Sequence, residues 1–569
     1  EVKGVITLDT VSDVFTTIIE RHEVLRTVYV TEGGTTLQRI RCLSECAFDI
    51  QVTDLSYLTG EMLAAQVKRL VTEESTKPFD LAQDVMLRVS FIKTGADSGV
   101  MLLNMHHIAS DGWSMAVLTQ EFFALYDAYR QGQQSPLAPL AIQYADYAHW
   151  QRTYLVGEVL ETQLSYWEQQ LDELPALHSL PLDYKRPETK QYTGAVVKGE
   201  LPAVTAQSLL ALAKAYQLTP FMLLHGALSL VLSRHSNSHD IVIGTPVANR
   251  LQAELAPLIG FFVNTLVLRV DTQHDTLADY FHHIKQVNLE AQAHQDVPFE
   301  QLVERLNVSR STAYSPLFQI MMATNTDFGF GEDFSDEISD EVDIQPYRSA
   351  LCQAKFDIDI NVHLDAQGAS LNWTYDVSLF SEAHITQLND HLCRLLEGLS
   401  QAQVSQPPQA LPLLSSAEID HLVSELNDTA MDYPKDKCLH ELFEQQAAAY
   451  PDNIAVVFEE STLTYQQLNA KANQLAHYLK ATQGITPDTL VGLCVERSLA
   501  MVIGILGILK AGGAYVPLDP SYPQERINYM LEDAALDVVL CHEQVNGVLT
   551  GFGGSIINLD GLAQNKHLL

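Results

Sequence analysis

The sequence predicts a mixed α/β protein, with α/β or α+β layers, that is divided into several domains. Apolar stretches of strand length are followed by segments with apolar residues at helical spacing, as in 99–105 and then 114–126. With 569 residues, the chain exceeds what one hydrophobic core usually holds. Its composition, 47% hydrophobic and 18% charged, is typical of globular proteins.

Charge and apolar patterning argue against several classes of protein. The net charge is −37, from 34 Lys and Arg against 71 Asp and Glu, whereas nucleic-acid binding needs a basic face. The most apolar segment, 500–510, is too short for a transmembrane helix and contains glycines. The first residues are not a basic, apolar leader with a small-residue end, so we expect no secretion signal. We therefore expect neither nucleic acid nor a membrane among the partners.

The seven cysteines indicate a reducing compartment. They are odd in number and scattered, which does not fit a disulfide framework. Cys42 and Cys46 are close together, but no second Cys/His pair follows at zinc spacing. We expect a cytoplasmic protein without a bound metal, and an exposed acidic loop at 331–343.

Residues 105–114, Met-His-His-Ile-Ala-Ser-Asp-Gly-Trp-Ser, join a predicted strand to a predicted helix. Asp111 and Gly112 predict a turn, and Ser114 can cap the helix that follows. Two histidines, a carboxylate and a glycine are thus gathered at a strand-to-helix junction, which is a common position for functional residues.

Strand geometry separates the two histidines of this stretch. Neighbouring strand residues point to opposite faces, so His107 is expected on the face of Met105, and His106 on the face of Asn104. Only one histidine can then enter a given cavity. From the residues alone, the alternative that both histidines simply close the strand stays open.

The pattern HHxxxDG in this context resembles the core motif of the condensation domains of nonribosomal peptide synthetases, which have the chloramphenicol-acetyltransferase-like fold. The form MHHIASDGWS resembles the subtype that joins an L-aminoacyl or peptidyl donor to an L-aminoacyl acceptor. An ordered series of such matches across roughly 400 residues makes a chance resemblance implausible. The further stretches that match motifs of this family are 21–27, 142–152, 240–250, 258–269 and 294–302.

This resemblance implies two acetyltransferase-like lobes in a V, with the active site in a tunnel between them. We assign the N-terminal lobe to 1–180 and the C-terminal lobe to 181–401, with the crossing between them at 181–193. The family's first motif is absent, so we expect the chain to begin inside the domain. A linker rich in Gln, Pro, Ser and Ala is expected at 402–437.

Residues 438–569 resemble the beginning of an adenylation domain, which belongs to the acyl-adenylate-forming enzymes. The stretches 463–469 and 509–523 match the first two motifs of that family. The third motif, a Ser/Thr/Gly-rich phosphate loop, does not appear, and the later ATP and amino-acid pocket residues are missing as well. We therefore expect no ATP site and no amino-acid activation in this part.

The resemblance implies an acyl transfer in which the acceptor's α-amine attacks the donor's thioester. No cofactor binds directly, because both substrates arrive on phosphopantetheine arms of an upstream donor and a downstream acceptor carrier domain, with an adenylation domain in cis. By resemblance, His107 either removes a proton from the amine or holds the free amine in line. Its reference pKa of about 6.5 suits both roles, against about 7.7–8.0 for an α-amine.

The resemblance also assigns roles around His107. Gly112, which lacks a Cβ, can bring a backbone N–H to the oxyanion, or it is simply a turn glycine. Asp111 is expected to pair with Arg250 and so hold the loop, while His106 orients the loop from the opposite face. The residues expected to line the tunnel are Trp113 and Asn264.

Several alternatives remain at the level of sequence. Asn264 equally fits a role in bridging strands, and in 142–152 we expect Tyr144 and Trp150 to be packing residues. The leading hypothesis is amide formation. The others are an epimerising or ester-forming homologue of the same fold, and a non-catalytic recruitment platform in a megasynthase, although the complete HHxxxDG favours catalysis. The donor and acceptor amino acids and the oligomeric state are not indicated by the sequence.

Overall fold

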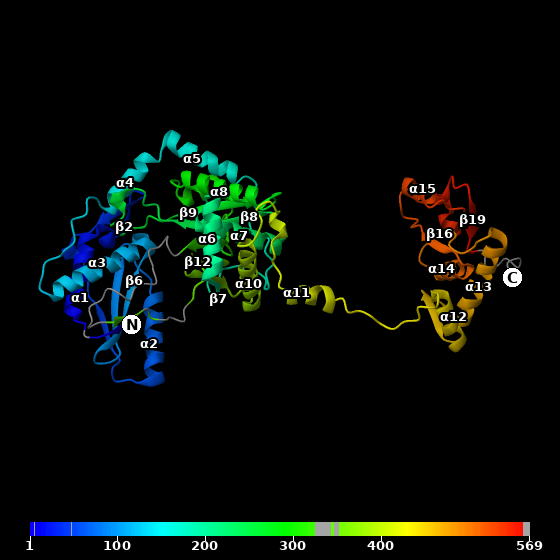
Figure 1. Cartoon of the computed structure of the whole chain (residues 1–569), viewed down its shortest axis with the longest axis horizontal. Coiled ribbons are helices and arrows are strands. Elements are labelled where there is room, and N and C mark those ends of the chain that lie inside the picture. The colour runs from blue at the N-terminus through cyan, green and yellow to red at the C-terminus, as the bar shows by residue number, and fades with distance from the viewer. Residues whose placement is uncertain (5, 47, 325–342, 346, 348–351, 561–569) are drawn as a thin grey trace. The chain divides into compact units, whose positions relative to one another are not determined.

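A computed structural model describes the chain except for residues 5, 47, 325–342, 346, 348–351 and 561–569 (Figure 1). The described residues form two compact units, Glu1–Leu426 and Asn427–Leu569. The acidic loop expected at 331–343 lies outside the described residues, apart from Asp343.

The N-lobe, the part of unit 1 that comes first in the chain, is built on a five-stranded sheet with the order β11-β1-β6-β5-β4. Strands β4 and β5 are parallel, and the other neighbours are antiparallel. The strands of this sheet are β1 (Val2–Lys3), β4 (Gln51–Asp54), β5 (Leu87–Lys93), β6 (Ser98–Met105) and β11 (Asp343–Ile344). The helices are α1 (Leu8–Arg21), α2 (Gly60–Thr76), α3 (Gly112–Arg130) and α4 (Tyr144–Tyr154), with 3-10 turns η1 (Glu23–Arg26), η2 (Leu43–Glu45) and η3 (His107–Ala109). Helix α5 (Gly157–Gln170) follows in the chain but packs on the C-lobe, because its buried Leu164 and Trp167 belong to the C-lobe core.

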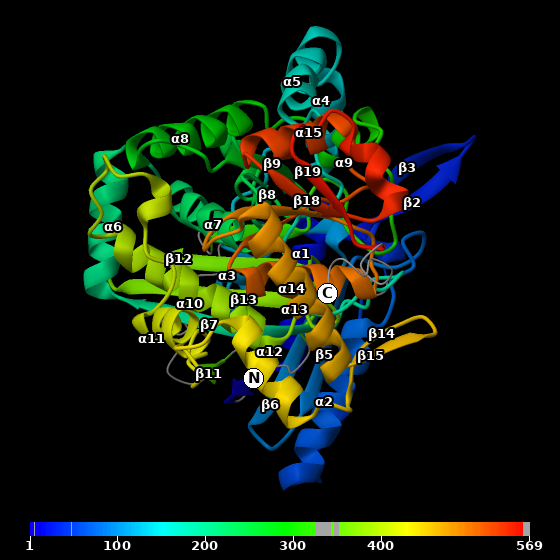
Figure 2. The ribbon, with the colours of Figure 1, turned by 90° about the vertical axis from the view of Figure 1, so that its right-hand side faces the viewer.

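Helices α1 and α3 pack together on this sheet because each presents a continuous apolar face. On α1, this face is fully buried and recurs at helical spacing, and its residues are Val11, Val14, Phe15, Ile18 and Ile19. A separate two-stranded ribbon, β2 (Thr27–Glu32) and β3 (Thr35–Ile40), projects from this part of the chain (Figure 2).

The C-lobe is built on a six-stranded sheet with the order β7-β13-β12-β10-β8-β9. Strands β8, β10 and β12 run parallel, so their carboxyl ends meet at one edge of the sheet. The strands are β7 (Gly194–Pro202), β8 (Asp240–Val247), β9 (Asn264–Asp271), β10 (Ile320–Thr324), β12 (Ile358–Leu364) and β13 (Gly368–Asp376). The helices are α6 (Ala203–Ala215), α7 (Pro220–Ser236), α8 (Leu277–Ala293), α9 (Phe299–Arg305) and α10 (Glu382–Leu399), with the 3-10 turn η4 (Ala253–Leu255).

One short strand links the two sheets of unit 1. β11 lies between β10 and β12 in the sequence, yet it pairs antiparallel with β1 of the N-lobe, Val2 opposite Ile344. A segment between two C-lobe strands therefore adds an edge strand to the N-lobe sheet.

The predicted linker, 402–437, is only partly an extended connection. Its first part packs on the C-lobe: Arg234 donates to the carbonyl oxygens of Pro408 and Leu411 at 2.7 Å each, and Leu411 is buried. A short helical patch follows, as α11 (Ser416–Asp420) and a π-helical turn (His421–Glu425), and unit 1 ends at Leu426. The boundary predicted at 401 thus falls before the end of the compact unit.

Unit 2 combines a small hairpin with a parallel four-stranded sheet of the order β17-β16-β18-β19. The strands are β14 (Ile454–Phe458), β15 (Ser461–Thr464), β16 (Leu490–Cys494), β17 (Ala514–Pro517), β18 (Val538–Cys541) and β19 (Ser555–Asn558). The helical elements of unit 2 are α12 (Leu439–Ala449), α13 (Tyr465–Gln483), α14 (Leu499–Ala511), α15 (Gln524–Asp533) and the 3-10 segment η8 (Glu543–Leu549). Unit 1 has a further 3-10 turn, η6 (Pro408–Ala410).

Within the described residues, no single helix is long and apolar enough to cross a membrane. Helices α6 and α7 meet the length and composition criterion only together, as a pair bent by 104°.

Candidate active site

The HHxxxDG stretch forms a compact loop between β6 and α3. The strand ends at Met105, and His107 begins a 3-10 turn. The alternation expected for a strand therefore does not extend to His107. The turn nevertheless directs the two histidine rings to different neighbours. His106 lies edge-on to Phe79 at 5.6 Å, and His107 lies edge-on to Phe261 at 5.1 Å, both measured between ring centroids.

The two histidines differ in exposure and hydrogen bonding. His106 is half-buried and its Nδ1 accepts from the backbone N–H of Ile108 at 3.0 Å, so the neutral ring carries its proton on Nε2. Burial, and secondarily the charge of His107, lowers the pKa of His106 below its ordinary value. His107 is exposed. His106 therefore stabilises the loop through a hydrogen bond to its backbone, whereas the His107 ring remains accessible.

The helix after the loop is capped by Asp111, not by Ser114 as predicted from the sequence. Asp111 has extended backbone angles, and its Oδ1 accepts from the backbone N–H of Ser114 at 2.8 Å. The reason is positional: a cap side chain accepts from an N–H two or three residues ahead, and α3 already begins at Gly112.

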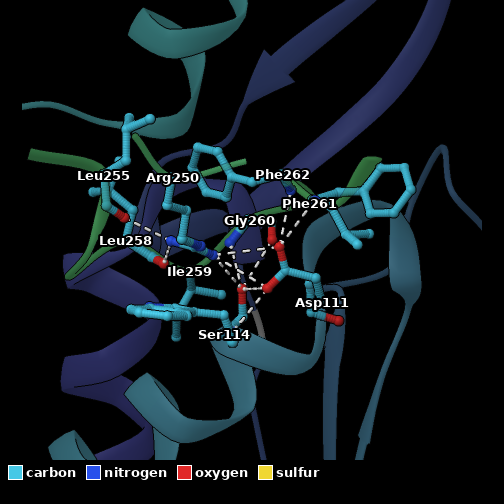
Figure 3. Close-up of polar contacts among 12 residues, drawn as sticks. Asp111, Ser114, Arg250, Leu255, Leu258, Ile259, Gly260, Phe261 and Phe262 are labelled. Carbon is cyan, nitrogen blue, oxygen red and sulfur yellow. Dashed lines mark hydrogen bonds and ion pairs between the residues drawn. The ribbon is translucent and has the colours of Figure 1, made fainter. Parts of the chain in front are cut away.

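The ion pair expected between Asp111 and Arg250 is present at the junction of the two lobes (Figure 3). Arg250 Nη2 lies 3.2 Å from Asp111 Oδ1 and 3.4 Å from Oδ2, and both side chains are 2% exposed. Asp111 Oδ2 also accepts from the backbone N–H groups of Phe262 at 3.0 Å and Val263 at 3.3 Å. These hydrogen bonds and the ion pair compensate for the desolvation cost of burying the Asp111 carboxylate.

Arg250 in turn holds the chain just beyond it. Its Nη1 donates to the carbonyl oxygens of Leu255 at 2.6 Å and Leu258 at 2.7 Å, and its guanidinium lies 4.0 Å from the ring centre of Phe262. Burial lowers the pKa of Arg250, while Asp111 opposes this change. An arginine remains charged under these conditions, so the ion pair persists at neutral pH.

Ser114 contributes a hydrogen-bond centre that the sequence analysis missed. Its hydroxyl lies 2.7 Å from Asp111 Oδ1 and 2.9 Å from Gly260 O, and it accepts from Gly260 N and from Arg250 Nη2 at 3.0 Å each (Figure 3). It is fully buried. The sequence could have indicated this contact, because Ser114 follows Asp111 by three residues and residues three apart lie on the same side of a helix.

Two further N-lobe side chains hold the same C-lobe segment, residues 259–263. His22 Nδ1 accepts from the backbone N–H of Ile259 at 3.3 Å, while its Nε2 lies 2.8 Å from the buried carboxylate of Glu121. The Tyr144 hydroxyl donates to the carbonyl oxygen of Phe261 at 3.0 Å. Only the match of 21–27 and 142–152 to the family pattern pointed to these contacts.

We call this arrangement the lobe joint: His22, Asp111, Ser114, Tyr144 and Arg250 bound to residues 259–263. The hydrogen bonds to residues 259–263 join N-lobe side chains to C-lobe backbone, whereas Asp111, Arg250 and Ser114 also bond to one another through their side chains. Its result is to present the Phe261 side chain, 38% exposed, to the His107 ring.

The remaining candidates lie around this joint. Gly112 is the first residue of α3, where backbone N–H groups have no acceptor within the helix. Trp113 donates from Nε1 to the carbonyl oxygen of Ala256 at 2.9 Å. Asn264 is buried, and its Nδ2 donates to the carbonyl oxygens of Gln295 and Val297 at 2.7 Å each. The Asn264 side chain thus ties the start of β9 to the turn after α8 and bridges no pair of the described strands, and Trp113 makes a contact across the joint.

Outside the joint, Trp150 does not pack as predicted. It is 41% exposed and stacks on Tyr154 with ring centroids 5.0 Å apart. The buried aromatic residue of α4 is Tyr147, because helical spacing turns that position toward Phe262. Among the described residues, no group of three or more His, Cys, Asp or Glu side chains could hold a metal ion.

Comparison with known families agrees with this architecture. The family model of the condensation domain matches residues 1–423, and that of the AMP-binding enzymes matches residues 443–560. The chain belongs to the condensation-domain family of nonribosomal peptide synthetases, followed by part of an adenylation domain.

Among its relatives is one of the linear gramicidin synthase proteins of Brevibacillus parabrevis, 42% identical over 547 residues, which are 96% of this chain and 7% of that protein. Surfactin synthase subunit 1 of Bacillus subtilis is 35% identical over 560 residues, 98% of this chain and 15% of that protein. The chain therefore spans a small part of the length of the curated relatives that it matches.

Solved structures share the same architecture. The four-domain nonribosomal peptide synthetase holo-AB3403, bound to AMP and glycine, is similar with a TM-score of 0.73 and 25% identity, covering 98% of this chain and 42% of that one. The condensation domain of the polyketide synthase MokA has a TM-score of 0.58 at 19% identity, covering 72% of this chain and 92% of that one, which shows the fold alone.

Proposed function

We propose that unit 1 forms peptide bonds between two substrates carried as thioesters. The observation that carries this proposal is the complete HHxxxDG loop: its carboxylate is bonded across the lobe joint, and the ring of His107 is left exposed beside Phe261. A loop held so firmly keeps a side chain at a defined position, which acyl transfer requires.

His107 meets the acceptor amine in this proposal. An α-amine is largely protonated at neutral pH, since its reference pKa is about 7.7–8.0, and attack needs the free amine. A neutral imidazole with a reference pKa of about 6.5 can accept the proton or hold the free amine toward the thioester carbonyl. The leaving thiol of the donor then takes up a proton, which balances the transfer.

Gly112 and the start of α3 supply the second part of the chemistry. The carbonyl oxygen becomes negative in the tetrahedral intermediate, and unpaired backbone N–H groups at a helix start stabilise negative charge. Because Gly112 has no Cβ, a substrate can approach the backbone closely at this position. Asp111, Ser114 and Arg250 are positioning residues, because they hold the loop without facing the reacting atoms.

The partners follow from this reaction. We propose that an upstream carrier domain brings the donor and a downstream carrier domain the acceptor, each on a phosphopantetheine arm, with an adenylation domain in cis. Residues 443–560 cover part of an AMP-binding domain, and we expect no amino-acid activation from this part alone. All seven cysteines are unpaired, which fits a reducing cytoplasm as the location.

The first test compares wild type with His107→Ala in the presence of donor-loaded and acceptor-loaded carrier proteins, with intact mass spectrometry of the condensed product. We expect product with wild type and at least a hundredfold less with His107→Ala, because general-base or positioning groups contribute about this much. The matched control is His149→Ala, at an exposed histidine of α4.

Equal product from wild type and a folded His107→Ala would contradict the catalytic role. An ester product, or inversion of the donor's α-carbon without condensation, would identify the ester-forming or epimerising alternative. Binding of both carriers without any product from wild type would identify a recruitment platform.

A further inference from the structure

The C-lobe contains a cavity that is separate from the lobe joint. It has a volume of about 340 Å³, within the range of small-ligand sites. It lies at the carboxyl edge of β8 and β12, between the sheet and the facing ends of α7 and α8. Carboxyl edges of parallel strands are frequent ligand sites in α/β proteins. We call this cavity the C-lobe pocket.

Two oxygen atoms of residues that line the C-lobe pocket, the Thr245 hydroxyl and Asn288 Oδ1, have no hydrogen bond to the described protein. Thr245, on β8, is 5% exposed, and its hydroxyl has no hydrogen-bond partner in the described part of the chain. Asn288, on α8, is 2% exposed and donates from Nδ2 to Ile284 O at 2.8 Å, with His225 Nδ1 at 3.2 Å, but no described group donates to its Oδ1. Both oxygens belong to residues that line the cavity, so they can bond to a ligand or water there.

The walls around these groups are apolar, and the mouth is exposed. Leu224, Leu266 and Leu268 are buried and line the pocket, whereas Pro220 and Gln292 are exposed at its rim. Among the lining residues that the structure describes, none is Lys, Arg, Asp or Glu. The titratable residue among the described lining residues is His363, and its Nε2 already lies 3.2 Å from Asp365 Oδ2. A carboxylate buried here would therefore lack a free cationic partner, which is costly.

The C-lobe pocket is near Arg250 of the lobe joint. Val247 lines it and ends β8, and Arg250 of the lobe joint follows three residues later. Their Cα atoms are therefore at most about 11 Å apart. Arg250 in turn binds Asp111 of the HHxxxDG loop, so the pocket adjoins the segment that holds this loop.

We propose that the C-lobe pocket binds an uncharged substrate side chain, apolar along its length and with a hydrogen-bonding end that meets Thr245 and Asn288. This rests on the proposed function, since the side chain belongs to the donor or the acceptor. The pocket accepts glutamine and its apolar counterpart methionine, and it rejects glutamate, whose carboxylate would be buried unpaired.

The test uses carrier proteins loaded with glutamine, methionine or glutamate, in one arm as acceptors with a glycine donor, and in the other arm as donors with a glycine acceptor. In the arm that uses the pocket, Thr245→Val lowers kcat/KM for glutamine about tenfold relative to methionine, because one buried hydrogen bond is lost. The matched control is Thr265→Val, which makes the same change on the neighbouring strand outside the pocket.

A binding measurement separates this inference from the proposed function. The probe N-acetyl-L-glutamine amide is titrated against the full chain by ligand-observed NMR, which requires no catalysis. We expect binding that Thr245→Val weakens at least fivefold and Thr265→Val leaves unchanged. If wild type condenses substrates but neither the rate ratio nor probe binding differs between the two variants, the pocket assignment is wrong. Absence of product together with Thr245-dependent probe binding would overturn the proposed function alone.

Discussion

Two buried carboxylates of unit 1, Asp111 and Asp357, are each paired with an arginine that is distant in the sequence, and they serve different ends. Asp111 meets Arg250 at the lobe joint, and Asp357, just before β12, meets Arg186 of the crossing segment with both oxygens, at 3.1 and 2.5 Å. Asp357 also lies 3.1 Å from His178. The two carboxylates are 2% and 0% exposed.

The difference lies in what else each carboxylate holds. Asp111 also accepts from the backbone N–H groups of Phe262 and Val263, which directly follow Phe261, the neighbour of His107. Asp357 accepts from side chains that fix the crossing segment inside the C-lobe. A change at Asp111 therefore reaches the site as well as the fold, whereas a change at Asp357 is confined to the fold.

The largest effect is expected for Asp111→Ala. It leaves the buried Arg250 charge without its carboxylate, which typically costs about 3–5 kcal/mol of unfolding free energy. It also releases residues 262–263, and we expect condensation to fall at least about a hundredfold, since small misplacements reduce rates this strongly. Denaturant unfolding and the carrier-based product assay measure the two effects. Full activity in Asp111→Ala would remove the distinction between the two carboxylates.

Asp357→Ala should cost a similar free energy of unfolding, about 3–5 kcal/mol, for the same reason. Its rate per folded molecule should stay within about twofold of wild type, because no contact of Asp357 reaches the lobe joint. The product assay is run well below the denaturation midpoint of the variant. A rate loss as large as that of Asp111→Ala would show that the crossing segment also positions the site.

The pH dependence of stability sharpens the role of Asp357. Burial by itself would raise the pKa of this carboxyl, but hydrogen bonds from His178 and Arg186, and the charge of Arg186, outweigh it and hold the pKa below its ordinary value. The paired carboxylate therefore contributes stability above about pH 4, the unfolded-state pKa, and this contribution is lost as the pH falls through the lower folded-state pKa. Urea unfolding between pH 6 and 2 should show a shallower acid loss in Asp357→Asn than in wild type.

A smaller effect is expected for Ser114→Ala. The change removes the acceptor of Gly260 N–H and one acceptor of Arg250, at a cost of about 1–3 kcal/mol. Because Asp111 still holds the joint, we expect a rate loss of only about tenfold. Ser208→Ala, at a half-buried serine of α6 whose hydroxyl donates only to Val204 O of the same helix, is the control. A loss equal to that of Asp111→Ala would make Ser114, instead of the ion pair, the main contact of the joint.

Much of the fold could be predicted from local patterns. The apolar face of α1 and the bounds of α7 follow from helical spacing and from Thr219 and Pro220 at the helix start. Predictions for single side chains, namely the cap of α3 and the burial of Trp150, were wrong. Ser114 was expected to cap α3, and Trp150 to pack, because the true helix start and the buried direction of α4 depend on neighbours distant in the sequence.

The sequence by itself determined the order of elements, the HHxxxDG loop at a strand-to-helix junction and the family resemblance, because these depend on residue type and spacing along the chain. Tertiary structure decided which groups hold that loop. His22, Ser114 and Tyr144 are separated from residues 259–263 by more than a hundred positions, and their hydrogen bonds exist only once the lobes are packed together. The unpaired Thr245 hydroxyl likewise becomes visible only when the packed C-lobe leaves a cavity beside it.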